Sequence, residues 1–222
     1  MAYFDIDDGV IQNLDSWHLQ ASLEADFLVK RKALDRAVWA LVILCERKDP
    51  YTARHQLRVA ELAYAVGKEM GLSDEQLDGM CVMSMIHDIG KVVLPNEILN
   101  KPGRLTPEEF NLVRSHPKAG YDVLKGLEFP WPVAEVILQH HERLDGSGYP
   151  AGLCGDDIIL EARILGVVDV FESMVSHRPY RPACGARAGL RELIRNSGVL
   201  YDPMVVEAFC RLGGKRILCF NI

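Results

Sequence analysis

Histidine and aspartate residues occur in this sequence in a pattern that suits metal-dependent catalysis. His87 and Asp88 are adjacent at the end of an apolar segment, and His140 and His141 form a second adjacent pair. Imidazole and carboxylate groups are the ligand types that suit iron, manganese or zinc at catalytic sites. Three further residues of the same two types stand alone, namely His55, His116 and Asp169. The set therefore indicates a site for catalytic metal ions.

Two of the single residues are expected to point into the interior. His55 lies on a helical face whose members at the i+4, i+7 and i+11 positions are apolar. Asp169 interrupts the apolar run ILGVVDVF, and a buried carboxylate costs several kcal/mol unless it is paired or bound to metal. The seven residues satisfy one another most simply by sharing metal ions. The alternative is that they are unrelated, hydrogen-bonded residues of the core.

The elements that would position these residues are helical almost throughout. Apolar residues recur at three- and four-residue spacing over 30–47, and Asp49-Pro50 ends that helix. Capping boxes at Ser73 and Thr106 open two further helices, the first running towards His87. Other helices are expected at 53–70, 132–141, 160–175, 186–196 and 203–212. Because no convincing alternating strand is present, the sequence predicts an all-α fold.

Composition and charge exclude several classes of protein. The chain has 222 residues, of which 49% are hydrophobic and 25% charged, as in ordinary globular proteins. A net charge of −6 argues against binding to a DNA or RNA duplex. A phosphate-containing substrate must therefore be held by local cations. The longest apolar run, 37–45, is far shorter than a membrane helix, which argues against membrane insertion. Six scattered cysteines and no secretory signal favour a cytoplasmic location.

Two longer motifs surround the histidine pairs. HDIGK at 87–91 and HHERLDGSGYP at 140–150 resemble the two signatures of HD-GYP domains, a branch of the HD metal-dependent phosphohydrolases. Supporting stretches match at 49–63, 94–110, 116–124 and 178–181. The resemblance implies an all-helical fold and hydrolysis of cyclic di-GMP to linear pGpG, in some members onward to GMP. We therefore expect a single HD-type helical bundle domain at 48–222. An N-terminal arm and helix at 1–47 would precede it and lead to a sensory module outside the given sequence.

Carried over position by position, the resemblance implies seven metal ligands around two divalent ions, iron or manganese. Asp88 would bridge the ions. One ion would take His55, His87 and Asp169, and the other His116, His140 and His141. Two cations roughly 3.5–4 Å apart can hold a bridging hydroxide and stabilise both the attacking and the leaving oxygen. Lys91, one turn beyond the first pair, is placed to neutralise charge on the phosphate, so Asp88 and Lys91 are the expected catalytic residues.

The second motif and a later segment are expected to bind substrate. Gly146 and Gly148 allow close approach by a ligand, and Tyr149 supplies a ring and a hydroxyl. Two arginines in a proline-flanked segment would bind phosphate through forked donors. The expected substrate contacts are Lys91, Gly148, Tyr149, Arg178 and Arg181. The alternatives are a plain surface turn and solvated arginines, while His18 and His177 lie outside the set.

Departures from the family pattern narrow the expected activity. Tyr51 stands where some members have a glutamate that supports a third metal, so we expect two metals and weak or absent formation of GMP. Glu172 stands where the family commonly has aspartate. The expected ligand is cyclic di-GMP, and the expected protein partners are a second copy of the chain or a diguanylate-cyclase-type protein. Two alternatives stay open: a catalytically weak cyclic dinucleotide receptor that signals through protein contacts, and the same chemistry on another cyclic dinucleotide.

Overall fold

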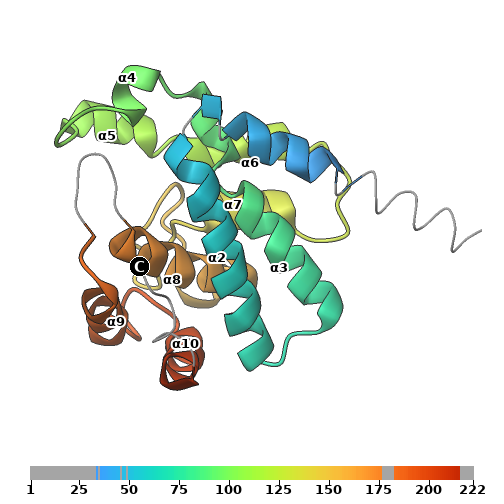
Figure 1. Ribbon diagram of the computed structural model, residues 1–222, viewed down its shortest axis with the longest axis vertical. Coiled ribbons are helices and arrows are strands. Elements are labelled where there is room, and N and C mark those ends of the chain that lie inside the picture. Colours follow the sequence, from blue (N-terminus) through green and yellow to red (C-terminus); the bar gives the residue numbers. More distant parts are fainter. Residues whose placement is uncertain (1–33, 35, 46, 49, 177–182, 216–222) are drawn as a thin grey trace, which may run out of the picture. The chain divides into compact units, whose positions relative to one another are not determined.

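Helices and short 3₁₀ turns form the regular structure of the chain in the computed structural model (Figure 1). It describes residues 34, 36–45, 47–48, 50–176 and 183–215. Within these residues no β-strand occurs, only two isolated bridges, so the all-α prediction is confirmed. The chain divides into two units, 1–40 and 41–222, and the second contains all seven candidate ligands. None of the helices among the described residues combines the length and apolar composition that a bilayer crossing requires.

Helices α2 (Pro50–Glu69) and α3 (Asp74–Ile86) lie side by side (Figure 1). α2 begins three residues before the predicted start at residue 53. Gly71, at φ +84°, ends it because a left-handed residue lets the chain turn while the last carbonyls accept N–H groups. The predicted capping box is present: Gln76 N–H donates to Ser73 Oγ over 3.2 Å, and Ser73 N–H donates to Gln76 Oε1 over 3.0 Å.

A run of short elements follows α3. They are η1 (Ile89–Val93), α4 (Asn96–Leu99), α5 (Pro107–Val113) and α6 (His116–Leu124). The helix expected to start at Pro107 after Thr106 is confirmed; it ends at Val113, and a new helix begins at His116. Pro117 explains the break, since it has no N–H to donate to the Val113 carbonyl. Its neighbour His116 donates to that carbonyl instead, through Nδ1 at 2.7 Å.

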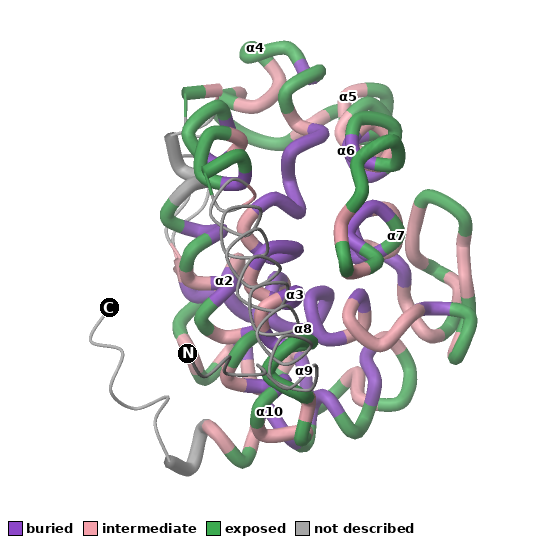
Figure 2. Tube along the Cα trace, turned by 90° about the vertical axis from the view of Figure 1, so that its right-hand side faces the viewer, coloured by how far each residue is buried: buried purple, intermediate pink, exposed green. Residues whose placement is uncertain are grey.

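The remaining elements complete the bundle. They are α7 (Val133–Gln139), η2 (Gly155–Asp157), α8 (Leu160–Val175), α9 (Ala186–Arg195) and α10 (Pro203–Lys215). α7 is shorter than the predicted helix 132–141, so His140 and His141 follow the helix instead of lying within it. α8 packs against α2 and is buried along most of its length, as the concentration of buried residues around α2, α3 and α8 shows (Figure 2).

Candidate metal centre

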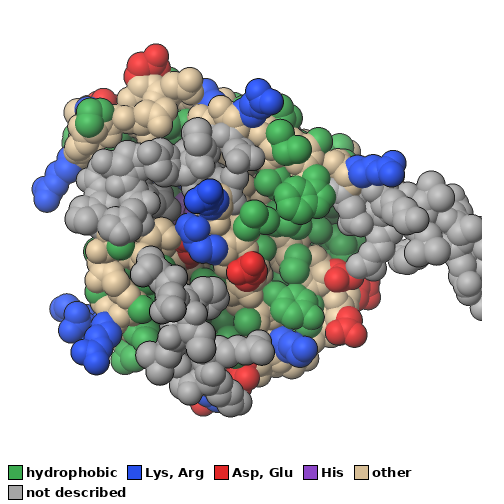
Figure 3. All heavy atoms as spheres, viewed as in Figure 1, with side chains coloured by type: hydrophobic (Ala, Val, Ile, Leu, Met, Phe, Trp, Pro, Cys, Tyr) green, Lys and Arg blue, Asp and Glu red, His purple; other side chains and the backbone are tan. Residues whose placement is uncertain are grey.

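The structure brings all seven candidate ligands together from five parts of the chain. Six of them are buried and His141 is half-buried, which fits the expectation that they point inward. On the face shown in Figure 3, almost no histidine surface is visible between the other side chains. Three groups have their donor atoms within 4.8 Å of one another: His55, His87 and Asp169; His116, His140 and His141; and His87, Asp88 and His140. The first two groups have the membership of the two sets expected from the sequence, and the third joins them.

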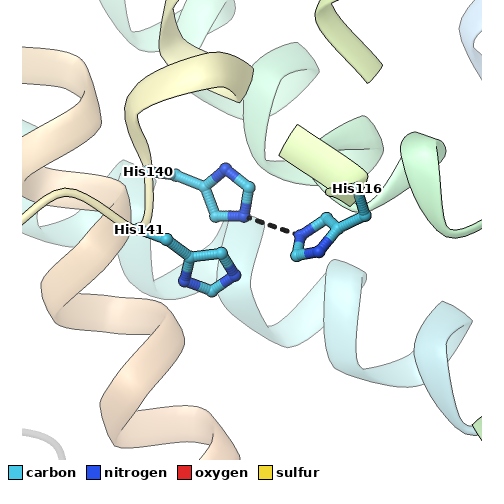
Figure 4. Close-up of side chains that lie close together, drawn as sticks. All are labelled: His116, His140 and His141. Atoms are coloured by element: carbon cyan, nitrogen blue, oxygen red, sulfur yellow. Dashed lines mark hydrogen bonds between the residues drawn. The ribbon is translucent and has the colours of Figure 1, made fainter. Parts of the chain in front are cut away.

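Distances within the cluster are short enough for shared ligation. In the first set, Asp169 Oδ1 lies 3.0 Å from His55 Nε2 and 3.8 Å from His87 Nε2. In the second set, the Nε2 atoms of His116 and His140 are 3.5 Å apart, and His141 faces them (Figure 4).

Asp88 lies between the two sets. Its Oδ2 is 3.5 Å from His87 Nε2, and its Oδ1 is 3.3 Å from His116 Nε2. Lys91 Nζ also contacts Oδ2, at 2.6 Å. Burial by itself would raise the pKa of Asp88, but the charge of Lys91 holds that pKa well below its usual range. An ionised carboxylate with one oxygen towards each set is the arrangement that a bridging ligand needs.

Three of the histidines are oriented by the same kind of hydrogen bond to a nearby backbone carbonyl. His87 and His140 each directly follow the last residue of a helix, and His116 begins α6, separated by two residues from the end of α5; carbonyl groups at such helix ends lack helical partners. Each Nδ1 donates over 2.7 Å to the carbonyl three residues earlier, on Ser84, Val113 and Ile137 respectively. A carbonyl only accepts, so Nδ1 carries the proton and Nε2 presents its lone pair to the cluster.

His55 is oriented differently, because it lies in the middle of α2. Its Nδ1 hydrogen-bonds to Glu172 Oε2 on α8. The other oxygen of Glu172 accepts from Arg58 Nε and from the Ser176 hydroxyl. Glu172 is therefore an anchor for a candidate ligand, in the way that carboxylates support metal-bound histidines. The sequence marked Glu172 only as a departure from the family pattern and missed Arg58.

The donor chemistry of the cluster fits divalent cations. The buried Nε2 atom of His87 has no hydrogen-bond partner among the described residues. Burial lowers the pKa of His116 to about 4 and that of His140 to about 3, so both are neutral at pH 7 with lone pairs available. His55 is the exception: burial opposes its protonation, but hydrogen bonds to Asp169 and Glu172 raise its pKa to about 9. A cation would take the place of that proton.

Comparison with known proteins agrees with this geometry. A family model described as HD domain matches residues 40–205. The chain belongs to the HD domain family. Cyclic di-GMP phosphodiesterase response regulator RpfG of Xanthomonas campestris is 40% identical over 184 residues, which are 82% of this chain and 48% of that protein. 3'3'-cGAMP-specific phosphodiesterase 1 of Vibrio cholerae is 40% identical over 136 residues, 61% of this chain and 32% of that protein.

A solved structure supports the same fold. The crystal structure of a cyclic GMP-AMP specific phosphodiesterase of Vibrio cholerae matches with a TM-score of 0.61 at 19% identity, over 81% of this chain and 48% of that one. The chain thus spans about half the length of this protein and of the Xanthomonas relative.

Close backbone packing in this HD domain explains the glycine of HDIGK. A Cβ on Gly90 would lie 1.9 Å from the His116 carbonyl oxygen and 2.6 Å from the Gly120 nitrogen. Only a glycine therefore lets η1 approach α6 this closely. The approach brings Asp88 next to His116, so Gly90 contributes to the geometry of the cluster although it carries no donor.

The loop after the tandem histidines is held by the residue that follows them. One oxygen of the buried Glu142 accepts from the N–H groups of Ala151 and Gly152, at 2.7 and 3.2 Å, and the other from Leu153 at 3.0 Å. Sequence reasoning missed this role. The available signal was an acidic residue beside a glycine-rich loop, where free N–H groups are plentiful.

Tyr149 lies in the same loop, against the cluster. Its N–H donates to the His141 carbonyl over 3.2 Å, and the two ring centroids are 4.7 Å apart. A Cβ on Gly148 would lie 2.4 Å from the Glu142 Cα, so the loop requires glycine there. Arg178 and Arg181 lie outside the described residues, as do His18 and His177, and the side chain of Tyr51 is not described.

Proposed function

We propose that this chain carries a metal-dependent phosphodiesterase that hydrolyses cyclic di-GMP to linear pGpG. The observation that carries the proposal is the convergence of seven histidine and aspartate side chains, with the two oxygens of Asp88 directed towards two different histidines. The name of the Xanthomonas relative states cyclic di-GMP phosphodiesterase activity, which supports this substrate and class of reaction. In this proposal residues 48–222 form the catalytic domain, and residues 1–47 connect it to another module.

Iron or manganese suits the mixed nitrogen and oxygen donors of the cluster. We assign the first ion to His55, His87 and Asp169, the second to His116, His140 and His141, and Asp88 to both. Bound there, the ions would activate water as a nucleophile and offset the charge of the phosphate oxygens.

The side chains around the cluster supply the remaining functions. The Lys91 ammonium, 2.6 Å from Asp88 Oδ2, is placed to donate to a phosphate oxygen as its negative charge grows. Tyr149 and Gly148 shape the wall on the His141 side, where the Tyr149 ring packs against the His141 ring. Arg178 and Arg181 are assigned to substrate phosphate on the resemblance alone. Burial of the cluster strengthens each of these electrostatic contacts by excluding bulk water.

The final product follows from the expected number of metal ions. Tyr51 replaces the glutamate that supports a third metal in some HD-GYP domains. We therefore propose a two-metal site at which pGpG accumulates and conversion to GMP is weak or absent.

The test combines metal analysis with product identification. Protein purified without oxygen is analysed for bound metals and incubated separately with cyclic di-GMP, 3'3'-cGAMP and cyclic di-AMP. We expect two metal equivalents and pGpG from cyclic di-GMP, and an Asp88→Asn variant without turnover, since the amide cannot bridge as a carboxylate does. Faster cleavage of 3'3'-cGAMP, as the name of the Vibrio relative suggests, would reassign the substrate. Binding without turnover in metal-loaded protein would instead favour a receptor.

A further inference from the structure

Arg114 lies over the ring of Tyr149, beside the candidate metal centre. It follows α5 and precedes His116 by two residues, and its side chain is half-buried. The carbon of its guanidinium group is 4.8 Å from the centroid of the Tyr149 ring. That ring is in turn 4.7 Å from the ring of His141. A continuous series of contacts therefore leads from a candidate ligand, through Tyr149, to a cationic group.

The guanidinium of Arg114 keeps its donors available. Among the described residues its side chain makes no hydrogen bond or ion pair, only the contact with Tyr149. Arg143 makes an instructive comparison, because it also lies over a ring, that of Tyr201, but donates to the Glu142 carbonyl at 2.8 Å. An aromatic face fixes a guanidinium by cation–π attraction while its N–H donors remain at the edge. Arg114 is thus held in place without using its hydrogen-bonding capacity.

We propose that Arg114 binds the second phosphodiester of a cyclic dinucleotide, the one that the metal centre does not cleave. This inference rests on the proposed function. A cyclic dinucleotide carries two phosphodiesters, and only one can lie at the metal ions beside Lys91. The other also carries a negative charge, and the chain as a whole has a net charge of −6, so a local cation is needed. A guanidinium fork suits this role because its paired N–H donors match two phosphate oxygens.

The test compares a substrate with two phosphodiesters to one that has a single phosphodiester. Arg114→Gln removes the charge, Arg114→Lys keeps it without the fork, and Arg104→Gln is the matched control on an exposed residue. The metal-loaded proteins are assayed with cyclic di-GMP, with cyclic di-AMP and with bis(4-nitrophenyl) phosphate. For Arg114→Gln we expect KM for cyclic di-GMP to rise roughly tenfold or more, the loss typical of a charge-assisted hydrogen bond. We expect a smaller rise for Arg114→Lys and none for Arg104→Gln. Metal content and cleavage of the single diester should stay unchanged.

Three results would overturn the inference. An unchanged KM for cyclic di-GMP means that Arg114 does not contact the substrate. An equal loss on bis(4-nitrophenyl) phosphate means that it acts through the metal centre. A loss with cyclic di-GMP but not with cyclic di-AMP means that it binds a guanine edge and not a phosphate.

Calorimetric binding of cyclic di-GMP separates this inference from the proposed function. If the wild-type protein binds cyclic di-GMP without cleaving it, the proposed function fails, and the ratio of Kd between Arg114→Gln and wild type still decides the role of Arg114. If the wild-type protein does not bind any cyclic dinucleotide, both fail.

Discussion

Glu172→Gln offers a sharp test of how the candidate metal centre is built. The substitution keeps the size of a buried side chain that contacts His55 on one side and Arg58 and Ser176 on the other. An amide has one acceptor oxygen where the carboxylate has two, so it cannot accept from all three partners. His55 then loses the negative charge that fixes its ring and increases the basicity of Nε2.

The expected loss of metal affinity follows from the loss of the hydrogen-bonded anchor of His55. Removing the anchor of a metal-bound histidine typically costs about 10- to 100-fold in metal affinity or activity, equivalent to about 1.4–2.8 kcal/mol. Because Glu172 is buried and serves only His55 among the candidate ligands, we expect loss of one metal equivalent before the other. The measurement is metal stoichiometry during titration with a chelator, together with kcat/KM for cyclic di-GMP.

The control for this variant is Glu135→Gln, the same chemical change at an exposed position on α7. It should leave both metal equivalents and the activity intact. If Glu172→Gln retains both metals with wild-type affinity, the anchoring role assigned to Glu172 is wrong.

Three further predictions concern the loop, the close contact of η1 with α6, and the metals. Glu142→Gln should loosen the loop that carries Tyr149, because one of three N–H groups loses its acceptor. We expect faster amide hydrogen exchange at 151–153 and a higher KM for cyclic di-GMP. Gly90→Ala should abolish turnover and lower the Tm, since the new Cβ would lie 1.9 Å from the His116 carbonyl oxygen. Chelation should lower the Tm by several degrees, because ions that bind only the folded state stabilise it by about 2.7 kcal/mol at a concentration of 100 Kd.

Each of these predictions has an outcome that contradicts it. Gly126→Ala is the control for Gly90→Ala, as its Cβ would meet nothing within 4 Å, and equal Tm values for the two variants would refute the close-contact argument. Wild-type exchange at 151–153 in Glu142→Gln would show that the carboxylate does not hold the loop. A Tm that does not respond to chelation, in protein proven to contain metal, would mean that the cluster contributes no binding energy to folding.

The parts of this structure that could be predicted from sequence are those set by local chemistry. The capping boxes at Ser73 and Thr106 formed as expected, since both partners lie within four residues of each other. The seven candidate ligands lie close together, as expected from motifs distinctive enough to indicate the family, and their binding of metal stays a prediction.

The parts that could not be predicted depend on contacts between distant segments or on a competition within one. Glu172 meets His55 and Arg58 across more than a hundred residues, and no local pattern encodes those contacts. The break between α5 and α6 is local, but it depends on Pro117 leaving a carbonyl for His116 to occupy. Periodicity alone cannot reveal such an exchange of donors.

Anomalous diffraction from crystals of protein loaded without oxygen, recorded at the iron and manganese absorption edges, tests the central claim most directly. The claim predicts two peaks, one beside His55, His87 and Asp169 and one beside His116, His140 and His141, with Asp88 in contact with both. A single peak, or peaks outside this cluster in a preparation that cleaves cyclic di-GMP, would contradict it.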